Sequence, residues 1–274
     1  MENNTIFTFI KRYRFILLGA FLLLTLTACG GSTEPIDENT SGFFNHYIVY
    51  NFSLLIKYFA NLFNGSYGWS LVLMTIIIRL ALMPLMLKQY KSQIEMREKM
   101  SVIQPEMQQI QEKYKGKKDP QSQQKMQQEL MQLYQKHNFN PLSTFGGCLP
   151  IIIQLPILMG FYWAIIRTPE IAESSFLWFS LGERDFILPF LAAAVYFIQF
   201  KVSQIGVPVQ PQQEQMMKTM GLITPIMMGA FSFSMAAALP LYWTVGGTFL
   251  IVQTLISKAL YKQPNAETPA KAEK

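Results

Sequence analysis

Arg79 is the residue whose chemistry conflicts most with its surroundings. It stands near the centre of SLVLMTIIIRLALMPLML, residues 70–87, a stretch otherwise apolar enough to lie in lipid. A charged arginine at the middle of a bilayer costs about 2.5–3.5 kcal/mol on insertion scales. Ionisable residues at this depth usually line a water-filled cavity or bind a partner, so Arg79 is the first candidate for a functional residue.

The apolar stretches contain no acidic side chain that could pair with Arg79. Their polar residues are neutral and include the amides Gln154 and Gln199. Arg79 is ten residues after Trp69 and eight before Leu87, which places either end of a helix more than about 10 Å away. We therefore expect a hydrated, positively charged cavity that attracts an acidic segment of another chain. In the alternative, Arg79 bonds backbone carbonyls and braces the helices around it.

The sequence offers no residue set for covalent or metal chemistry. It shows no Ser/His/Asp arrangement, no paired carboxylates in the apolar stretches and no Cys/His cluster. His46 and His137 fall in segments that we expect on opposite sides of a membrane. We predict that the protein is not an enzyme and uses no cofactor and no metal.

The composition predicts the elements that must position Arg79. Half of the 274 residues are hydrophobic and only 15% are charged, whereas a soluble domain carries about 25%. The apolar residues gather in runs of roughly 18 to 25, the length that spans a bilayer as a helix. We predict an all-α polytopic membrane protein with a first transmembrane helix over 69–87 and four more within 140–260. These four are expected over 142–166, 186–201, 217–237 and 241–260, with the last two forming a tight hairpin around Leu239 and Pro240.

Loop charge predicts the orientation. Residues 88–139 carry ten Lys and Arg, whereas residues 30–68 carry one. The positive-inside rule places 88–139 in the cytoplasm, together with the short tail 261–274. The expected location is the bacterial cytoplasmic membrane, with the N-terminal segment outside and the C-terminus inside.

The N-terminus has the features of a lipoprotein signal peptide over 1–28. A basic region precedes an apolar run that ends in LTAC, residues 26–29, which resembles a bacterial lipobox. Cys29 is then the lipidation site; an uncleaved signal anchor is the alternative. Residues 29–68 form an extracytoplasmic linker and an amphipathic helix over 43–63, expected in the outer membrane interface, with a short span as the alternative.

Residues 88–139 predict a cytoplasmic helical hairpin. Apolar residues recur at helical spacing in two stripes, separated by KGKKDP. Asp119 and Pro120 are a helix N-cap and first-turn proline, and Pro105 should bend or interrupt the first arm. The hairpin is either a solvated spacer or a flexible contact surface for partners. Its basic residues alternate with acids, so we expect no nucleic-acid binding.

Three motifs resemble a known family. They are IIIRLALMPL around Arg79, the GCLP…Q.P pattern from Gly147 to Pro156, and LPLYWTVGGTFLIVQ near the C-terminus. Over residues 43–260 the chain is similar to the YidC/Oxa membrane protein insertases, in the lipoprotein form found in Gram-positive bacteria. The resemblance implies five helices around a hydrophilic groove that is open to the cytoplasm and closed to the outside.

The same resemblance implies the groove residues and the partners. The groove would be lined by Arg79, Gln154, Gln199 and Trp243, while Gly247 stands where the family often has an asparagine, which suggests closer helix packing. The expected partners are nascent membrane proteins and the lipid bilayer, with the Sec translocon and the ribosome as candidates and a monomer as the working unit. A small-solute transporter or channel is the alternative, and it predicts a coupling carboxylate or a pore.

Overall fold

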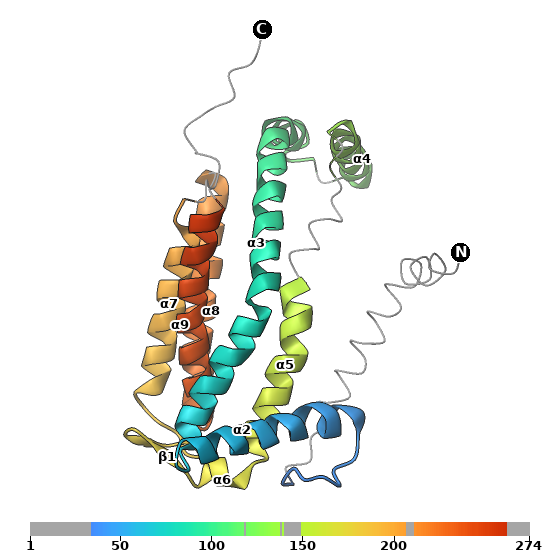
Figure 1. The fold of residues 1–274 in the computed structure, drawn as a ribbon. Helices are drawn as coiled ribbons and strands as arrows, with labels where there is room; N and C mark the ends of the chain where they lie inside the picture. The colour runs from blue at the N-terminus through green and yellow to red at the C-terminus, as the bar shows by residue number, and fades with distance from the viewer. Residues whose placement is uncertain (1–33, 118, 138, 140–148, 207–210, 262–274) are drawn as a thin grey trace, which may run out of the picture.

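The computed structural model describes residues 34–117, 119–137, 139, 149–206 and 211–261. The predicted signal peptide, Cys29, and Gly147 and Cys148 of the GCLP motif lie outside these residues. The described part is almost entirely helical (Figure 1). Its elements are η2 (Asn45–Tyr50), α2 (Asn51–Leu62), α3 (Tyr67–Lys113), α4 (Pro120–Lys136), α5 (Leu149–Ile166), α6 (Pro169–Ala172), β1 (Ser175–Phe176), β2 (Phe179–Ser180), α7 (Leu188–Gln204), α8 (Pro211–Ser234) and α9 (Ala238–Leu260).

α3 joins the first predicted span to the predicted hairpin without a break. It runs for 47 residues, about 70 Å at 1.5 Å per residue. Pro84 and Pro105 both lie inside it, so of the two outcomes expected at Pro105, a bend or an interruption, the interruption does not occur. Figure 1 shows the helix changing direction along its length instead. A proline removes one backbone hydrogen bond, which a long helix tolerates by bending.

α7 is the central helix of the C-terminal bundle, because it packs on both α8 and α9. α9 also packs on α3. The link between α8 and α9 is residues 235–237, and Pro240 lies in the first turn of α9. The prediction of a tight hairpin around Leu239 and Pro240 is therefore wrong: the two helices are joined closely, but each packs on α7 rather than along the other.

Two of the described helices, α3 and α9, are long and apolar enough to cross a membrane. Shorter apolar helical stretches occur over Gln154–Ile166 and Gly221–Ser234. The protein is thus an all-α membrane protein in outline, and the count of five spans stays a prediction.

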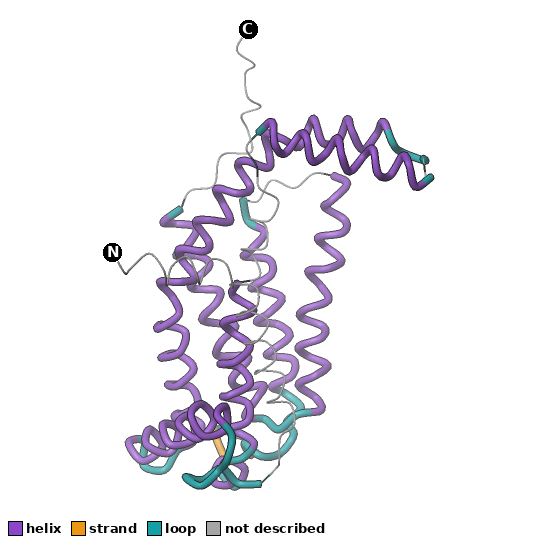
Figure 2. Tube along the Cα trace, turned by 90° about the vertical axis from the view of Figure 1, so that its right-hand side faces the viewer, coloured by secondary structure: helices purple, strands orange, loops and turns teal. Residues whose placement is uncertain are grey.

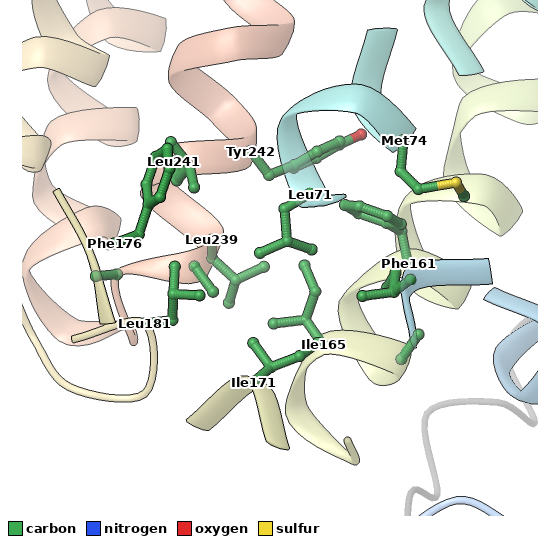
Figure 3. Packing of buried hydrophobic residues seen from close by; sticks show 14 of the residues in the cluster. Leu71, Met74, Phe161, Ile165, Ile171, Phe176, Leu181, Leu239, Leu241 and Tyr242 are labelled. Carbon is green, nitrogen blue, oxygen red and sulfur yellow. The ribbon is translucent and has the colours of Figure 1, made fainter. Parts of the chain in front are cut away.

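A cluster of buried apolar side chains closes one end of the helices. It lies where α2, α6 and the two short strands cross the ends of α3, α5 and α9 (Figures 1 and 2). Figure 3 shows these side chains converging from separate elements. They include Leu71 and Met74 of α3, Phe161 and Ile165 of α5, Leu181, and Leu239 and Tyr242 of α9.

Arg167, just after α5, is also buried at this end, with 2% of its surface exposed. Its Nε donates to the Glu34 carbonyl at 2.7 Å and its Nη1 to Asn45 Oδ1 at 3.3 Å. Its own carbonyl accepts from the Ile36 N–H at 3.0 Å. These bonds dock residues 34–36 onto the junction of η2 and α5, which sequence reasoning did not anticipate.

The opposite end carries the predicted helical hairpin, formed by the last part of α3 and by α4 (Figure 2). Ile103, Leu133 and Phe139 are the buried centre of its seam. The Asp119 carboxylate accepts from the Ser122 N–H at 2.8 Å, which confirms the predicted cap, and Pro120 opens α4. The hairpin is also crossed by ion pairs Lys113–Glu129 at 2.6 Å and Lys136–Glu106 at 2.8 Å.

Candidate functional site

Arg79 lies in α3 between the buried cluster and the hairpin, and its side chain is half-buried. Its Nη1 donates to Gln154 Oε1 of α5 at 3.4 Å. This is a long bond for a guanidinium, and it uses one of five N–H donors. Within the described residues Arg79 forms no salt bridge with an aspartate or glutamate. The partner found is an amide side chain rather than the backbone carbonyl of the bracing alternative.

α9 makes room for the guanidinium at Gly246. A Cβ atom there would lie 3.0 Å from Arg79 Nη2 and 3.4 Å from Nε. The next residue, Gly247, faces α7, where a Cβ would lie 2.7 Å from Val195 Cγ1. The predicted close packing at Gly247 is confirmed. Two consecutive glycines thus let α9 approach α3 on one side and α7 on the other.

Two tyrosines bring further polar groups to this point. Tyr242 of α9 is buried and Tyr196 of α7 is partly buried. Both phenol groups lie close enough to Arg79 to interact with its charge, and Tyr242 also interacts with Gln154. Figure 3 shows the Tyr242 ring at the edge of the buried apolar cluster. Arg79 therefore sits where the apolar packing gives way to hydroxyl and amide groups.

α5 is the helix most loosely joined to the rest at this level. It packs on η2, α2 and α6, and more weakly on α9. Among the described residues, the backbones of α3 and α5 are not closely packed on each other, although side chains of both helices join the buried apolar cluster. The bond from Arg79 to Gln154 is therefore not enclosed by a tight helix–helix interface, and the half-exposed state of both side chains agrees with this.

A partly exposed arginine in an apolar helix agrees with the resemblance that IIIRLALMPL carries. Comparison with known proteins decides its family. The family model described as "60Kd inner membrane protein" matches residues 58–264. The chain belongs to this family.

Curated relatives of the family cover nearly the whole chain. Membrane protein insertase MisCA of Bacillus subtilis is 46% identical over 93% of this chain and 94% of its own length. Membrane protein insertase MisCB of the same organism is 44% identical over 90% of this chain and 93% of its own. Membrane protein insertase YidC 2 of Bacillus anthracis is 47% identical over 90% and 94%. The resemblance to YidC-type insertases is confirmed.

The four groove residues expected from the family are only partly brought together. Arg79 and Gln154 are in contact. Gln199 is partly buried on α7, three residues beyond Tyr196. Trp243 is partly buried and packs against the apolar cluster. In the described part of the chain no hydrogen bond or ion pair joins Gln199 or Trp243 to Arg79, so their place in the groove stays a prediction.

Sequence reasoning missed three residues that lie near Arg79. Tyr196, Tyr242 and Gly246 all approach Arg79. Two of them flank predicted residues: Tyr242 precedes Trp243, and Gly246 precedes Gly247. Helical spacing alone did not indicate which of two neighbouring residues faces α3, because α9 is contacted on more than one side.

Proposed function

We propose that this protein inserts other proteins into the bacterial cytoplasmic membrane, through a hydrated groove whose central charge is Arg79. The observation that carries the proposal is the state of Arg79: half-buried among apolar helices, with one long bond to a neutral amide. A guanidinium in this state retains donors for a carboxylate from another chain. The relatives are named membrane protein insertases, which agrees with this role.

The incoming chain supplies the missing counter-charge. Its hydrophobic segment lies against the lipid side of the helices, while its short polar outer tail enters the groove and an acidic residue pairs with Arg79. The groove shortens the dry distance that the tail must cross. The apolar segment then partitions into lipid, where about 20 apolar residues outweigh the desolvation of a short tail.

The groove opens to the cytoplasm in this proposal. The buried apolar cluster closes the opposite end of the groove, so a tail that has entered the groove has only this short apolar layer left to cross. The membrane potential, positive outside, favours outward movement of an acidic tail by about 2.3 kcal/mol per charge per 100 mV. No covalent step and no cofactor is required.

The proposal also locates the other elements relative to the membrane. The hairpin of α3 and α4 faces the cytoplasm and receives nascent chains, with the ribosome and the Sec translocon as candidate partners. Five helices span the membrane, α2 lies in its outer interface, and Cys29 carries a lipid on the outer side. The protein works as a monomer.

The test uses liposomes that contain this full-length protein as their sole insertion factor. The substrate is a single-span protein with a short acidic outer tail, and the readout is protection of that tail from external protease. Insertion well above that of empty liposomes is expected. Absence of insertion, or a solute flux through the same liposomes in place of it, would contradict the proposal.

A further inference from the structure

The turn between β1 and β2 exposes two large apolar side chains on the surface of the molecule. Phe176 and Phe179 pair across the strands, and Leu177 and Trp178 form the tip between them. Leu177 is 69% exposed and Trp178 is 53% exposed. Water-facing hairpin tips use Asn, Asp and Gly instead, because these residues are polar and conformationally permissive.

The backbone of Leu177 makes this choice costlier. Its φ is 55°, in the left-handed region, where a residue with a Cβ costs roughly 1–2 kcal/mol. Asn64, with φ 52°, is the only other non-glycine residue with a positive φ in the described part of the chain. An asparagine at 177 would therefore suit the backbone better than leucine, and the gain from leucine must come from what its side chain touches.

The base of the tip is fixed to the start of α3. Phe176 and Phe179 are each only 6% exposed and belong to the buried apolar cluster. The Phe176 ring packs over Gly68, and its centroid lies 5.3 Å from that of Trp69. The tip is thus mounted rigidly beside the point at which a membrane-spanning helix begins.

From this placement we propose that Leu177 and Trp178 insert into the outer leaflet of the bilayer and bind lipid there. The tip continues the exposed apolar surface at the start of α3. Trp69, in the first turn of α3, is 52% exposed, and tryptophan at the end of a spanning helix lies at the headgroup level. The ring contact between Trp69 and Phe176 places the base of the tip at that level, and the tip carries no charge that would oppose insertion.

The tip sets the depth of Arg79. Arg79 is ten residues beyond Trp69, about 15 Å along the helix, which is half of a hydrocarbon core about 30 Å thick. Holding the start of α3 at the outer interface therefore keeps the guanidinium at mid-membrane depth. This consequence rests on the proposed function, whereas the lipid contact itself does not.

The experiment places a photoreactive benzophenone amino acid at position 178 of the full-length protein in bacterial membranes. Arg184, exposed in the same outer segment, is the matched control position. After illumination, mass spectrometry of the purified protein identifies what is attached. We expect phospholipid adducts at 178 to exceed those at 184 at least fivefold. Adducts mainly to another protein, or equal lipid yields at both positions, would overturn the proposal.

A second variant separates the side chain from the backbone. Leu177→Asn keeps the left-handed turn and removes the apolar group, while Leu177→Met keeps an apolar group. With the probe at 178, Leu177→Asn should reduce lipid adducts at least twofold at an unchanged melting temperature, and Leu177→Met should not. An unchanged adduct yield in Leu177→Asn would overturn the role of Leu177. The readout requires no insertion activity, so its failure is distinguishable from failure of the proposed function.

Discussion

Arg79 of α3 donates a hydrogen bond to Gln154 of α5 across 3.4 Å, between two helices whose backbones are not closely packed on each other. The charge therefore rests on a weak, neutral contact that an incoming carboxylate can replace. In the bond to Gln154 only the donor is ionised, whereas in a pair with a carboxylate both partners are ionised and the guanidinium can form two parallel bonds, which favours that exchange.

Replacing the amide by an acid should inhibit the protein. Gln154→Glu supplies an internal carboxylate for Arg79, which competes with the acid of the substrate. We expect insertion of acidic-tailed substrates to fall about tenfold, equivalent to about 1.4 kcal/mol. Gln154→Leu adds no carboxylate that could compete for Arg79, so it should lower insertion by no more than about twofold. Protease protection in liposomes measures both, and equal activities of the two variants would contradict competition for Arg79.

The two glycines of α9 should separate activity from stability. Gly246→Ala adds a methyl 3.0 Å from the Arg79 guanidinium, which a flexible side chain accommodates by moving. We expect insertion to fall severalfold with little change in melting temperature. Gly247→Ala meets Val195 at 2.7 Å inside the bundle, and should lower stability by about 1–3 kcal/mol. Lower stability in Gly246→Ala, together with lower insertion at unchanged stability in Gly247→Ala, would contradict the prediction that Gly246 faces Arg79 and Gly247 faces α7.

Arg167 should be a strong determinant of stability at the end of the helices that holds the buried apolar cluster. Arg167→Met leaves the Glu34 carbonyl and Asn45 without their donor. Hydrogen bonds to charged groups contribute about 1.5–3 kcal/mol each, so the melting temperature should fall clearly and protease should cleave near residues 34–36 sooner. Arg184→Gln, at an exposed site, is the control and should change neither. Unchanged proteolysis in Arg167→Met would refute the docking of residues 34–36.

The hairpin should loosen in acid. Hydrogen bonds from Lys136 and His137 lower the pKa of Glu106, and those from Lys113 and Tyr114 lower the pKa of Glu129. A carboxylate with a lowered folded-state pKa stabilises the fold above its unfolded pKa, about 4.3, and loses that effect as the pH falls through the folded value. Hydrogen exchange in the hairpin, corrected for intrinsic rates, should therefore rise below about pH 4.

The control for this acid effect is the pair of substitutions Glu106→Gln and Glu129→Gln. The doubly substituted hairpin should exchange faster near neutral pH and show little further change in acid. An acid-induced rise as large as in the parent protein would mean that other groups cause it.

The elements were largely predictable because each obeys a local rule. Asp119 and Pro120 begin α4 as expected, and the apolar stripes of the hairpin meet at Ile103 and Leu133. The errors arose where tertiary structure overrides local preference. α3 continues through Pro105 without the interruption that was one of its two expected outcomes, and Pro240 belongs to the first turn of α9 rather than to a turn between helices.

The sequence predicted the charged residue of the site, Arg79, but few of the side chains that surround it. Arg79 stood out because an arginine is rare in an apolar helix, and Gln154 because amides are rare there too. Tyr196, Tyr242 and Gly246 did not stand out, since tyrosine and glycine are common in such helices. Their role depends on which faces of α7 and α9 lie toward Arg79, and that is set by packing between segments distant in sequence.

The most direct measurement compares Arg79→Ala and Arg79→Lys in liposomes that contain the protein as sole insertion factor. The substrates are one single-span protein with an acidic outer tail and the same protein with a neutral tail. We expect Arg79→Ala to lower insertion of the acidic-tailed substrate at least tenfold and Arg79→Lys largely to retain it, since lysine keeps the charge. Normal insertion of the acidic-tailed substrate by Arg79→Ala, with both variants folded, would contradict this expectation.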